Sequence, residues 1–244
     1  MSRKEKKPKL YRNLASWFHL LTAPDDYADE ARRYRKIFIE ASNHVPHKVL
    51  ELGSGGGNNA LHLKKYFDLT LTDISPDILR LSKNINPECK HIAGDMRTLR
   101  IGQEFDAVFV HDAICYITNK RDLLAVIKTA FIHCRSGGVV LFCPDFFRET
   151  FKPKTTHGGH DEKGRGLRYV EWIHDPNPKD TTYIQDFAYL LREEDKKVRV
   201  EHDRHIMGVF KRNDWIRLLT KGGFMSFTGK LSVKIDDVVI GVKR

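Results

Sequence analysis

The chain has 244 residues, of which 41% are hydrophobic, so it can bury the core of one α/β domain. It has no apolar run long enough to span a bilayer and no apolar leader at its start, so we expect a cytoplasmic protein without membrane contact. The formal net charge of +10 would attract anions, but the sequence lacks an RNA-binding pattern, so nucleic acid stays open without being the expected partner.

The cysteines and the N-terminal charges say little about function. Cys89, Cys115, Cys134 and Cys143 are widely spaced and form no C-x-x-C pair, which indicates reduced thiols and neither a zinc site nor a disulfide framework. Residues 1–9 hold a run of Lys and Arg that is most simply a basic, solvated tail. Residues 10–244 are expected to form a single domain.

Two helices are predicted ahead of the first strand. Aromatic and leucine residues recur at spacings of three and four over residues 11–21, which is the pattern of a short amphipathic helix. Residues 23–26 interrupt this pattern, and residues 27–41 form a second helical pattern. Because such helices must bury an apolar side, we expect residues 10–42 to cover the part of the domain that follows.

A glycine-rich loop follows the first predicted strand. Residues 48–57 read Lys-Val-Leu-Glu-Leu-Gly-Ser-Gly-Gly-Gly, with Glu51 near the end of the apolar run. Glycine has no Cβ, so the backbone can turn sharply after the strand and approach a cofactor closely. Residues 58–67 have helical spacing, so the loop ends at a helix N-terminus, whose free N–H groups suit an anionic ligand group.

Polar residues stand at the ends of four successive predicted strands. After the first strand, the strand patterns cover residues 69–72, 90–93 and 105–110, with a helix over residues 76–84. The polar residues are Glu51, Asp73, Asp95 and His111. Because the carboxyl ends of parallel strands line one crevice, these side chains should converge there. Asp73 stands where the ribose of a nucleoside cofactor would lie, although an Asp at this position can also cap the following helix.

A dinucleotide site is the competing interpretation. Gly55, Gly57 and Ala60 satisfy the G-x-G-x-x-A pattern of nicotinamide and flavin sites, and Asp73 could still serve a ribose. Glu51 and the step from Gly94 to Asp95 favour a nucleoside with an adenine amino group instead of a pyrophosphate. We therefore rank the dinucleotide second.

The ordered set of E-x-G-x-G-x-G, Asp73 and Gly94-Asp95-Met96 resembles the class I S-adenosylmethionine-dependent methyltransferases, over roughly residues 45–145. This resemblance implies an α/β fold with a Rossmann-like, seven-stranded, mostly parallel sheet and helices on both faces. It also implies S-adenosyl-L-methionine as the cofactor. By the same resemblance, Gly53, Ser54 and Gly55 would contact the methionine end of the cofactor, Asp73 its ribose, Asp95 and Met96 its adenine, and His111 the region near the methionine and methyl group. Glu51 and Ile74 are also expected among the cofactor-binding residues.

The C-terminal half predicts additions to this core. After a strand over residues 139–143 comes a polar loop at residues 155–161, then period-two segments at residues 167–174, 181–192 and 197–204. Turn-rich residues separate these segments, so residues 150–207 are predicted to form a loop and an antiparallel β-meander, inserted after strand five above the crevice. Residues 208–244 are predicted to add a helix at 213–221 and a closing pair of strands at 224–231 and 238–242.

The polar loop also raises the question of a metal. His157, His160 and Asp161 have a spacing that could bind zinc or iron, but no third ligand is identifiable, so no metal site is predicted. Glycines at residues 158–159 and 164–166 indicate a loop that opens and closes over the substrate.

The expected function is transfer of a methyl group by in-line displacement to an N or O atom of a small molecule, in which alignment and exclusion of water carry most of the rate. The meander and the helical lid look like those of bacterial methyltransferases that N-methylate amino sugars and amino acids. An RNA methyltransferase and a non-catalytic cofactor-binding protein are the alternatives, and a homodimer stays open. Groups that could move a proton or lie near the methyl group are His111, Tyr116, Tyr11, His157 and His160, with Tyr27 as a second lid tyrosine.

Overall fold

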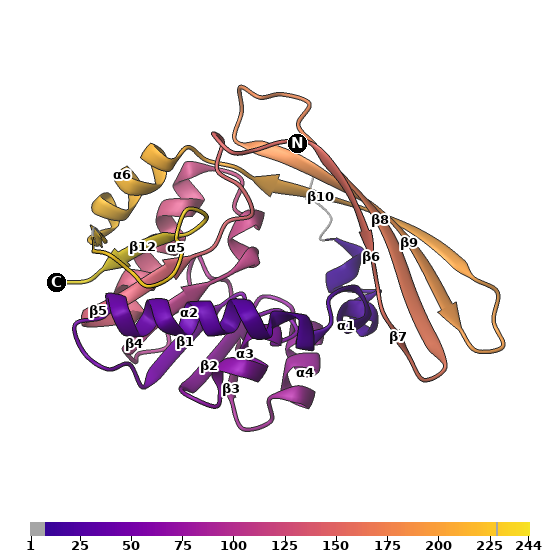
Figure 1. Cartoon of the computed structure of the whole chain (residues 1–244), viewed down its shortest axis with the longest axis horizontal. Coiled ribbons are helices and arrows are strands. Elements are labelled where there is room, and N and C mark those ends of the chain that lie inside the picture. Colours follow the sequence, from indigo (N-terminus) through magenta and orange to yellow (C-terminus); the bar gives the residue numbers. More distant parts are fainter. Residues whose placement is uncertain (1–7, 228) are drawn as a thin grey trace.

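The computed structural model describes residues 8–227 and 229–244. The predicted basic tail therefore lies, as far as residue 7, outside the described residues. Two sheets organise the rest of the chain, one mostly parallel with helices on its faces and one antiparallel (Figure 1). Within the described part, no helix is both long and apolar enough to cross a membrane.

The first sheet confirms the predicted seven-stranded, Rossmann-like arrangement. Its strands, in spatial order, are β11 (Met225–Ser226), β12 (Val239–Val242), β5 (Cys134–Phe142), β4 (Phe105–Val110), β1 (Lys48–Leu52), β2 (Asp68–Asp73) and β3 (Lys90–Ala93). Strands β1 to β5 pair in parallel, whereas β12 pairs antiparallel with β5 and β11. The chain runs outward through β2 and β3 and returns to the other side of β1 as β4. A ligand crevice is expected where the strand order reverses in this way, at the carboxyl ends of β1 and β4.

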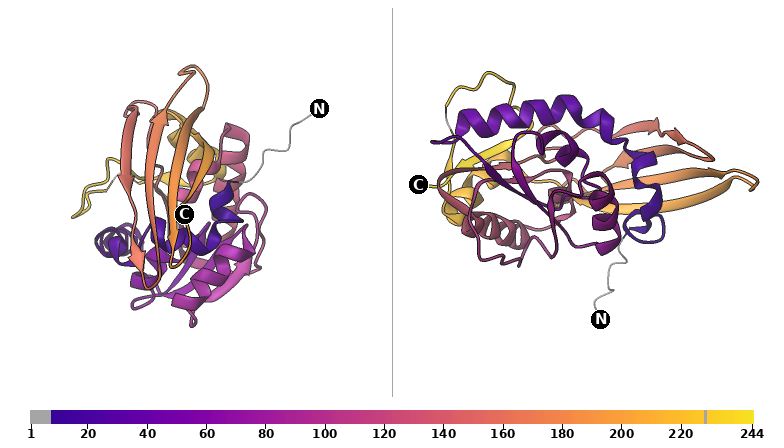
Figure 2. Two further views of the ribbon diagram at one scale, coloured as in Figure 1. Left: turned by 90° about the vertical axis from the view of Figure 1, so that its right-hand side faces the viewer. Right: turned by 90° about the horizontal axis from the view of Figure 1, so that it is seen from below.

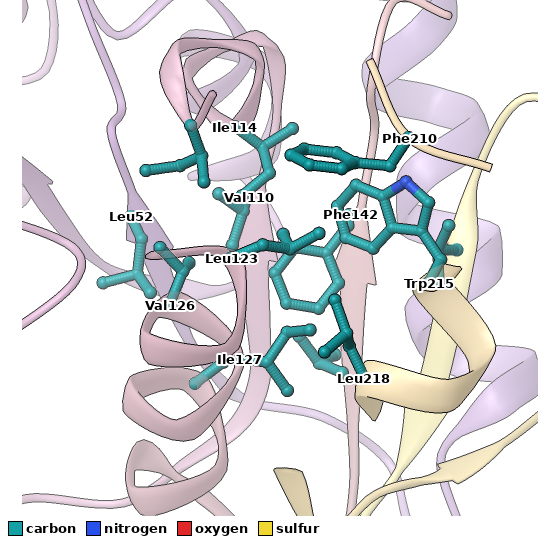
Figure 3. Packing of buried hydrophobic residues seen from close by; sticks show 14 of the residues in the cluster. Leu52, Val110, Ile114, Leu123, Val126, Ile127, Phe142, Phe210, Trp215 and Leu218 are labelled. Atoms are coloured by element: carbon teal, nitrogen blue, oxygen red, sulfur yellow. The ribbon is translucent and has the colours of Figure 1, made fainter. Parts of the chain in front are cut away.

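Helices cover both faces of this sheet, as predicted. The helices are α2 (Ala28–Ala41), α3 (Asn58–Leu63), α4 (Pro76–Ile85), α5 (Lys120–His133) and α6 (Arg212–Gly222). Ala107 and Phe109 of β4 pack in the core cluster that contains α2, whereas Val108 and Val110 pack in the cluster that contains α5 and α6 (Figure 3). Burial from both sides explains why β4 is a continuous apolar run instead of an alternating one.

Local signals determine where several of these helices begin and end. Ser75 caps α4 by accepting the Ile78 N–H at 3.4 Å, and the next residue, Pro76, suits the first helical position. Asn119 caps α5 by accepting the Asp122 N–H at 2.9 Å. Gly223 ends α6 in the left-handed conformation, with φ of 104°.

The N-terminal segment is helical only in short pieces. In place of one helix over residues 11–21, the structure has η1 (Lys9–Tyr11), η2 (Ala15–Trp17) and the four-residue α1 (Phe18–Leu21), followed by η3 (Pro24–Tyr27). Their apolar side chains join the inner face of the second sheet in one core cluster. Spacings of three suit 3₁₀ turns as well as an α-helix, and the short turns let the segment bend around that face. Figure 1 shows α1 between the two sheets.

The second sheet is the predicted meander with two additional strands. Its strands are β6 (Lys154–Gly158), β7 (Asp161–Glu162), β8 (Arg165–His174), β9 (Thr182–Glu193) and β10 (Arg199–Gly208). The order is β10-β9-β8-β6, with β7 also paired to β8, and every pairing is antiparallel. The long strands extend well beyond the first sheet (Figure 2).

The prediction of a mobile polar loop at residues 155–161 is wrong. Residues 154–158 are β6, and Gly158 pairs with Tyr169 of β8. Gly159 has φ of 116°, and a Cβ there would lie 2.1 Å from the Leu167 carbonyl oxygen, so this glycine allows a close backbone approach. The glycines that suggested a hinge are thus needed for packing between strands.

Candidate active site

A cavity of about 740 Å³ lies between the carboxyl ends of β1 to β4 and the inner face of the second sheet. The N-terminal segment supplies Tyr11, Phe18 and Tyr27 to its wall, and η4 (Asp112–Tyr116) follows β4 into it. The four strand-end residues predicted to converge all line this cavity; they are Glu51, Asp73, Asp95 and His111. The two halves of the chain therefore share one site.

The glycine loop is held close to the sheet. Gly53 and Gly55 have φ of 74° and 54°, and a Cβ on Gly53 would lie 2.3 Å from the Ala113 Cβ, so glycine is required there. The backbone N–H of Ser54 donates to the Thr72 carbonyl at 2.8 Å. The Ser54 hydroxyl oxygen is buried against the cavity and has no hydrogen-bond partner among the described residues, so it is placed to bind a polar ligand group.

Acidic side chains concentrate beneath this loop. Glu51 is only 3% exposed, and burial, followed by the charges of Glu30, Asp73 and Asp112, raises its pKa to about 8. Burial is also the main cause that raises the pKa of Glu30 and of Asp112. Like charges in a poorly solvated site disfavour ionisation of one another. A cationic ligand group would relieve this repulsion, and S-adenosylmethionine carries both an ammonium and a sulfonium.

His111 connects two of these acids. Its Nε2 lies 3.0 Å from the Tyr34 hydroxyl and 3.4 Å from a Glu30 oxygen, and its Nδ1 lies 3.2 Å from Asp112. Burial lowers the pKa of His111, so the imidazole is neutral at neutral pH. Since both ring nitrogens already face protein groups, His111 is placed to orient this end of the cavity. Tyr34 could not be identified from the sequence, because its position on α2 looks like ordinary core.

The predicted ribose and adenine side is also assembled. Asp73 Oδ2 accepts the Gly55 N–H at 3.1 Å and Oδ1 accepts the Ser75 N–H at 2.8 Å, while the neighbouring Ile74 offers an apolar surface that is 48% exposed. Asp95 and Met96 line the same end. Arg97, which the sequence analysis did not single out, binds both Asp95 oxygens, with a shortest distance of 2.6 Å. These residues fit a nucleoside: carboxylates for hydroxyl and amino groups beside an apolar wall.

The other end of the cavity holds two predicted tyrosines. The hydroxyl oxygens of Tyr11 and Tyr116 are 3.0 Å apart, and the two rings meet edge to face. Tyr116 also contacts the Nδ1 of His205 at 2.8 Å. Tyr27, the second lid tyrosine, lies instead beside His111, with ring centroids 6.2 Å apart.

Two carboxylates also face this end. Asp145, directly after β5, accepts the Tyr183 hydroxyl at 2.8 Å, and Glu171 of β8 accepts the Thr156 hydroxyl at 2.6 Å. Neither carboxylate forms an ion pair with a Lys or Arg of the described residues. Burial raises the pKa of Glu171. This half of the cavity is therefore acidic and aromatic.

His157 and His160 do not lie in the cavity wall. His157 is exposed on β6, and His160 forms an ion pair with Asp26 at 3.1 Å while its backbone N–H donates to Leu20. Their proposed catalytic role therefore has no geometric support, because His157 points to the opposite face of β6 from Thr156, the neighbour that contacts the cavity residue Glu171. Across residues 8–227 and 229–244, no group of three or more His, Cys, Asp or Glu side chains is arranged to hold a metal ion.

Several cavity residues were not identified from the sequence. They are Arg97, Asp112, Asp145, Glu171, Gln185 and His205. Three of these, Glu171, Gln185 and His205, come from the meander. Period-two alternation separates the two faces of a strand, but it does not say which face meets the cavity. Asp145 had a usable signal, because it follows a parallel strand just as Asp73 does.

The family described as "Methyltransferase domain" matches residues 49–138, which span the glycine loop and the strand-end acids. This match confirms the predicted class I S-adenosylmethionine-dependent methyltransferase domain over these residues. This methyltransferase uses S-adenosylmethionine as its cofactor, as predicted. It is 27% identical, over 72% of this chain and 69% of the relative, to the dTDP-3-amino-3,6-dideoxy-alpha-D-glucopyranose N,N-dimethyltransferase of Streptomyces fradiae.

A second curated relative has a related activity. The dTDP-3-amino-3,4,6-trideoxy-alpha-D-glucopyranose N,N-dimethyltransferase of Streptomyces venezuelae is 25% identical to the methyltransferase, over 81% of this chain and 83% of the relative. Solved structures agree on the fold. DesVI of Streptomyces venezuelae superposes with a TM-score of 0.82 at 22% identity, covering 95% of this chain and 98% of DesVI. The amino pentose methyltransferase CalS10 of Micromonospora echinaspora gives 0.78 at 19% identity, covering 96% and 97%.

Proposed function

We propose that this methyltransferase N-methylates the amine of a nucleotide-activated amino sugar. The observation that carries the proposal is the acidic acceptor end of the cavity, where Asp145 and Glu171 stand on the side of Tyr11 and Tyr116. The names of the two curated relatives, both dTDP-amino-sugar N,N-dimethyltransferases, support the same acceptor class.

The cofactor roles expected from the resemblance become part of this proposal. Asp73 would bind the ribose hydroxyls, with Ile74 against the nucleoside, and Asp95 and Met96 would contact the adenine. The negative charge of an ionised Glu51 would compensate the positive charge of the cofactor's ammonium group. The glycine loop, Gly53 to Gly55, would place the methionine end through its backbone and the Ser54 hydroxyl, while His111 would orient the acids around it. When bound, the cofactor supplies an electrophilic methyl group on a positively charged sulfur.

The acidic end of the cavity suits nitrogen as the acceptor atom. When a neutral amine attacks a methyl sulfonium, the positive charge moves from sulfur to nitrogen. Carboxylates near the nitrogen stabilise this positive charge as it develops. Fixed charges aimed at a developing charge are an effective source of catalysis. A hydroxyl acceptor would instead have to lose its proton and approach as an oxyanion, which the two carboxylates disfavour.

The experiment is a competition between two acceptors that differ at one atom. The purified enzyme is given S-adenosylmethionine with dTDP-3-amino-3,6-dideoxyglucose, or with the analogue that bears a hydroxyl in place of the amine. Mass spectrometry should show one and then two added methyl groups on the amine and none on the hydroxyl analogue. Methylation of the hydroxyl analogue, or of neither compound, would contradict the proposal.

Two further expectations stay within the proposal. A homodimer is tested by light scattering during size-exclusion chromatography, and a cytoplasmic location is tested by cell fractionation. The net charge of +10 can attract RNA, so bulk RNA serves as a control substrate. The proposal expects no methyl incorporation into RNA.

A further inference from the structure

Behind the two cavity tyrosines lies a buried histidine and carboxylate pair on β10. His205 and Asp203 are two residues apart on a strand, so both point inward, and they are 2% and 6% exposed. His205 Nε2 is 3.1 Å from Asp203 Oδ2, which also accepts the Leu10 N–H at 3.0 Å. Burial raises the pKa of Asp203, but these hydrogen bonds outweigh it and the pKa is lowered. Asp203 is therefore an ionised acceptor.

An ionised Asp203 determines which nitrogen of His205 carries the proton. It accepts a hydrogen bond from Nε2–H, which leaves a lone pair on Nδ1 of the neutral imidazole. Nδ1 is 2.8 Å from the Tyr116 hydroxyl, so Tyr116 donates to it. The Tyr116 oxygen can then accept from the Tyr11 hydroxyl, 3.0 Å away, because each hydroxyl rotates to suit its neighbours.

These four side chains form a continuous path from the cavity into the protein. Tyr11, Tyr116 and His205 line the cavity, whereas Asp203 does not. They come from three parts of the fold: Tyr11 from η1, Tyr116 from η4, and His205 and Asp203 from β10. Apolar side chains of similar volume would fill this space without burying a charge, so packing alone does not account for the path.

The members of the path differ in their ability to hold a proton. Burial raises the pKa of Tyr11 and of Tyr116 well above the ordinary value, so neither is a stable tyrosinate near neutral pH. Each can pass a proton on by receiving one and giving one up. His205 is the member placed to keep the proton, because its Nδ1 faces the Tyr116 hydroxyl and its Nε2 faces the carboxylate of Asp203.

We propose that Asp203 and His205 form the inner end of a proton relay that, through Tyr116 and Tyr11, deprotonates the acceptor ammonium before methyl transfer. His205 acts through Tyr116 and is thus a positioning residue and proton store, not a group that touches the acceptor. The relay rests on the proposed function, since it requires an acceptor that arrives with an ionisable N–H.

The relay moves the proton in three transfers. A proton passes from the acceptor ammonium to the Tyr11 oxygen, the Tyr11 proton passes to Tyr116, and the Tyr116 proton passes to His205 Nδ1. The amine becomes neutral, and His205 becomes an imidazolium beside ionised Asp203. The nitrogen lone pair then forms the bond to the methyl carbon while the carbon–sulfur bond breaks and its electron pair stays on sulfur. After product release, the imidazolium returns its proton to water through the same tyrosines.

The main test is the pH profile of His205→Gln with dTDP-3-amino-3,6-dideoxyglucose as the acceptor. Glutamine can still hydrogen bond to Tyr116, but it cannot store a proton. The expected kcat is lower by about 100-fold at pH 7, in the range for general acid–base catalysis, with KM for the acceptor nearly unchanged. Above about pH 9 the free amine is abundant in solution, so the variant should approach the wild-type rate.

The matched control is His202→Gln. His202 lies on the same strand but faces outward, with its side chain 67% exposed. It should keep the wild-type rate at every pH. The buried pair is faced by Tyr11, Tyr116, Glu171 and Tyr189. The pH profile of kcat can be interpreted only if these groups stay intact. Calorimetry with S-adenosylhomocysteine should give an affinity within about twofold for both variants, since the relay does not hold the nucleoside.

A second variant covers the case in which His205→Gln does not fold. Asp203→Asn keeps the size of the side chain but removes its charge, and its amide oxygen in the place of Oδ2 can accept both the Leu10 N–H and the Nε2–H of His205. The imidazolium then has no carboxylate beside it, and the same pH-dependent loss of kcat is expected. A loss that is equal at all pH values in either folded variant would overturn the relay and leave the pair a purely structural role.

Nitrogen NMR of the His205 imidazole tests the relay independently of the proposed function. If the wild-type enzyme methylates no amino sugar, the proposed function fails, and the relay is then decided by the tautomer of His205. A neutral Nε2–H form at pH 8 in the wild-type protein supports the relay. An Nδ1–H form in the wild-type protein would contradict it.

Discussion

The carboxylate of Asp73 accepts the backbone N–H of Gly55 at 3.1 Å, so the residue proposed to bind the ribose also holds the glycine loop. Its second oxygen accepts the N–H of Ser75, the residue that caps α4. From the sequence, Asp73 could either bind the ribose of the cofactor or cap the following helix. In the structure the side chain makes structural hydrogen bonds while lining the cavity, so loop geometry and cofactor affinity should change together.

We therefore expect Asp73→Ala to weaken binding of S-adenosylmethionine by roughly 1.5 to 3 kcal/mol, the range for hydrogen bonds to a charged group. The loss of the tether to Gly55 should show as a less favourable binding entropy, because the loop must then be ordered by the ligand. Isothermal titration calorimetry measures both. Asp77→Ala, on the half-exposed first turn of α4, is the control and should bind normally. An unchanged affinity for folded Asp73→Ala would leave Asp73 with its structural role alone.

Glu51→Gln should raise the stability of the protein and weaken the binding of the cofactor. The pKa of Glu51 is about 8 in the folded protein and about 4.3 in an unfolded chain. Between these values the unfolded chain gives up the proton and the folded protein keeps it, so the wild type loses stability as pH rises through this window. Glutamine does not titrate, so the gain in Tm should grow from pH 5 to pH 8 and reach about 5 °C or more.

The measurement for Glu51→Gln is thermal unfolding at several pH values, paired with cofactor titration. Affinity for S-adenosylmethionine should fall, because the amide cannot compensate the cofactor's ammonium. Glu104→Gln, at an exposed site, controls for a general effect of removing a carboxylate. A Tm difference that does not change with pH would show that Glu51 does not titrate in this window.

The sequence was sufficient for the cofactor half of the site. Strand ends are local signals, and in a parallel sheet every carboxyl end faces the same crevice, so Glu51, Asp73 and Asp95 could be placed together without a structure. The first sheet and its helices follow from the same patterns. The N-terminal helix was less predictable, because apolar spacing of three and four does not distinguish an α-helix from consecutive 3₁₀ turns.

The acceptor half could not be derived in this way. Its residues depend on how the second sheet is oriented over the first, and this orientation is set by long-range packing of the N-terminal segment on the inner face. His157 and His205 illustrate the difficulty, since both lie on strands of this sheet but only His205 faces the cavity. A polar, glycine-rich stretch such as residues 155–161 also resembles a loop, even though its backbone pairs as an edge strand.

The strand assignment changes what mutation of the glycine pair should do. Gly159→Ala would place a Cβ 2.1 Å from the Leu167 carbonyl oxygen at a φ of 116°, so we expect a loss of stability of roughly 2 to 4 kcal/mol. Gly158→Ala is the milder partner, because its Cβ would meet only the Tyr169 ring, at 3.0 Å. Chemical denaturation compares the two. Reduced turnover of Gly159→Ala at unchanged stability would instead support the hinge that the sequence indicated.

The acceptor-end carboxylates provide the sharpest test of nitrogen as the acceptor atom. If Asp145 and Glu171 stabilise the charge that develops on nitrogen, Asp145→Asn and Glu171→Gln should each lower kcat/KM for dTDP-3-amino-3,6-dideoxyglucose by about 10- to 100-fold. Both amides still accept the hydrogen bonds of Tyr183 and Thr156, so the fold is expected to remain intact. Affinity for S-adenosylhomocysteine, which carries no sulfonium charge, should stay nearly constant. Asp68→Asn, at the opposite end of β2, is the control for loss of one negative charge. Wild-type kcat/KM in both cavity variants would mean that the negative charge at this end does not act on the methylated atom.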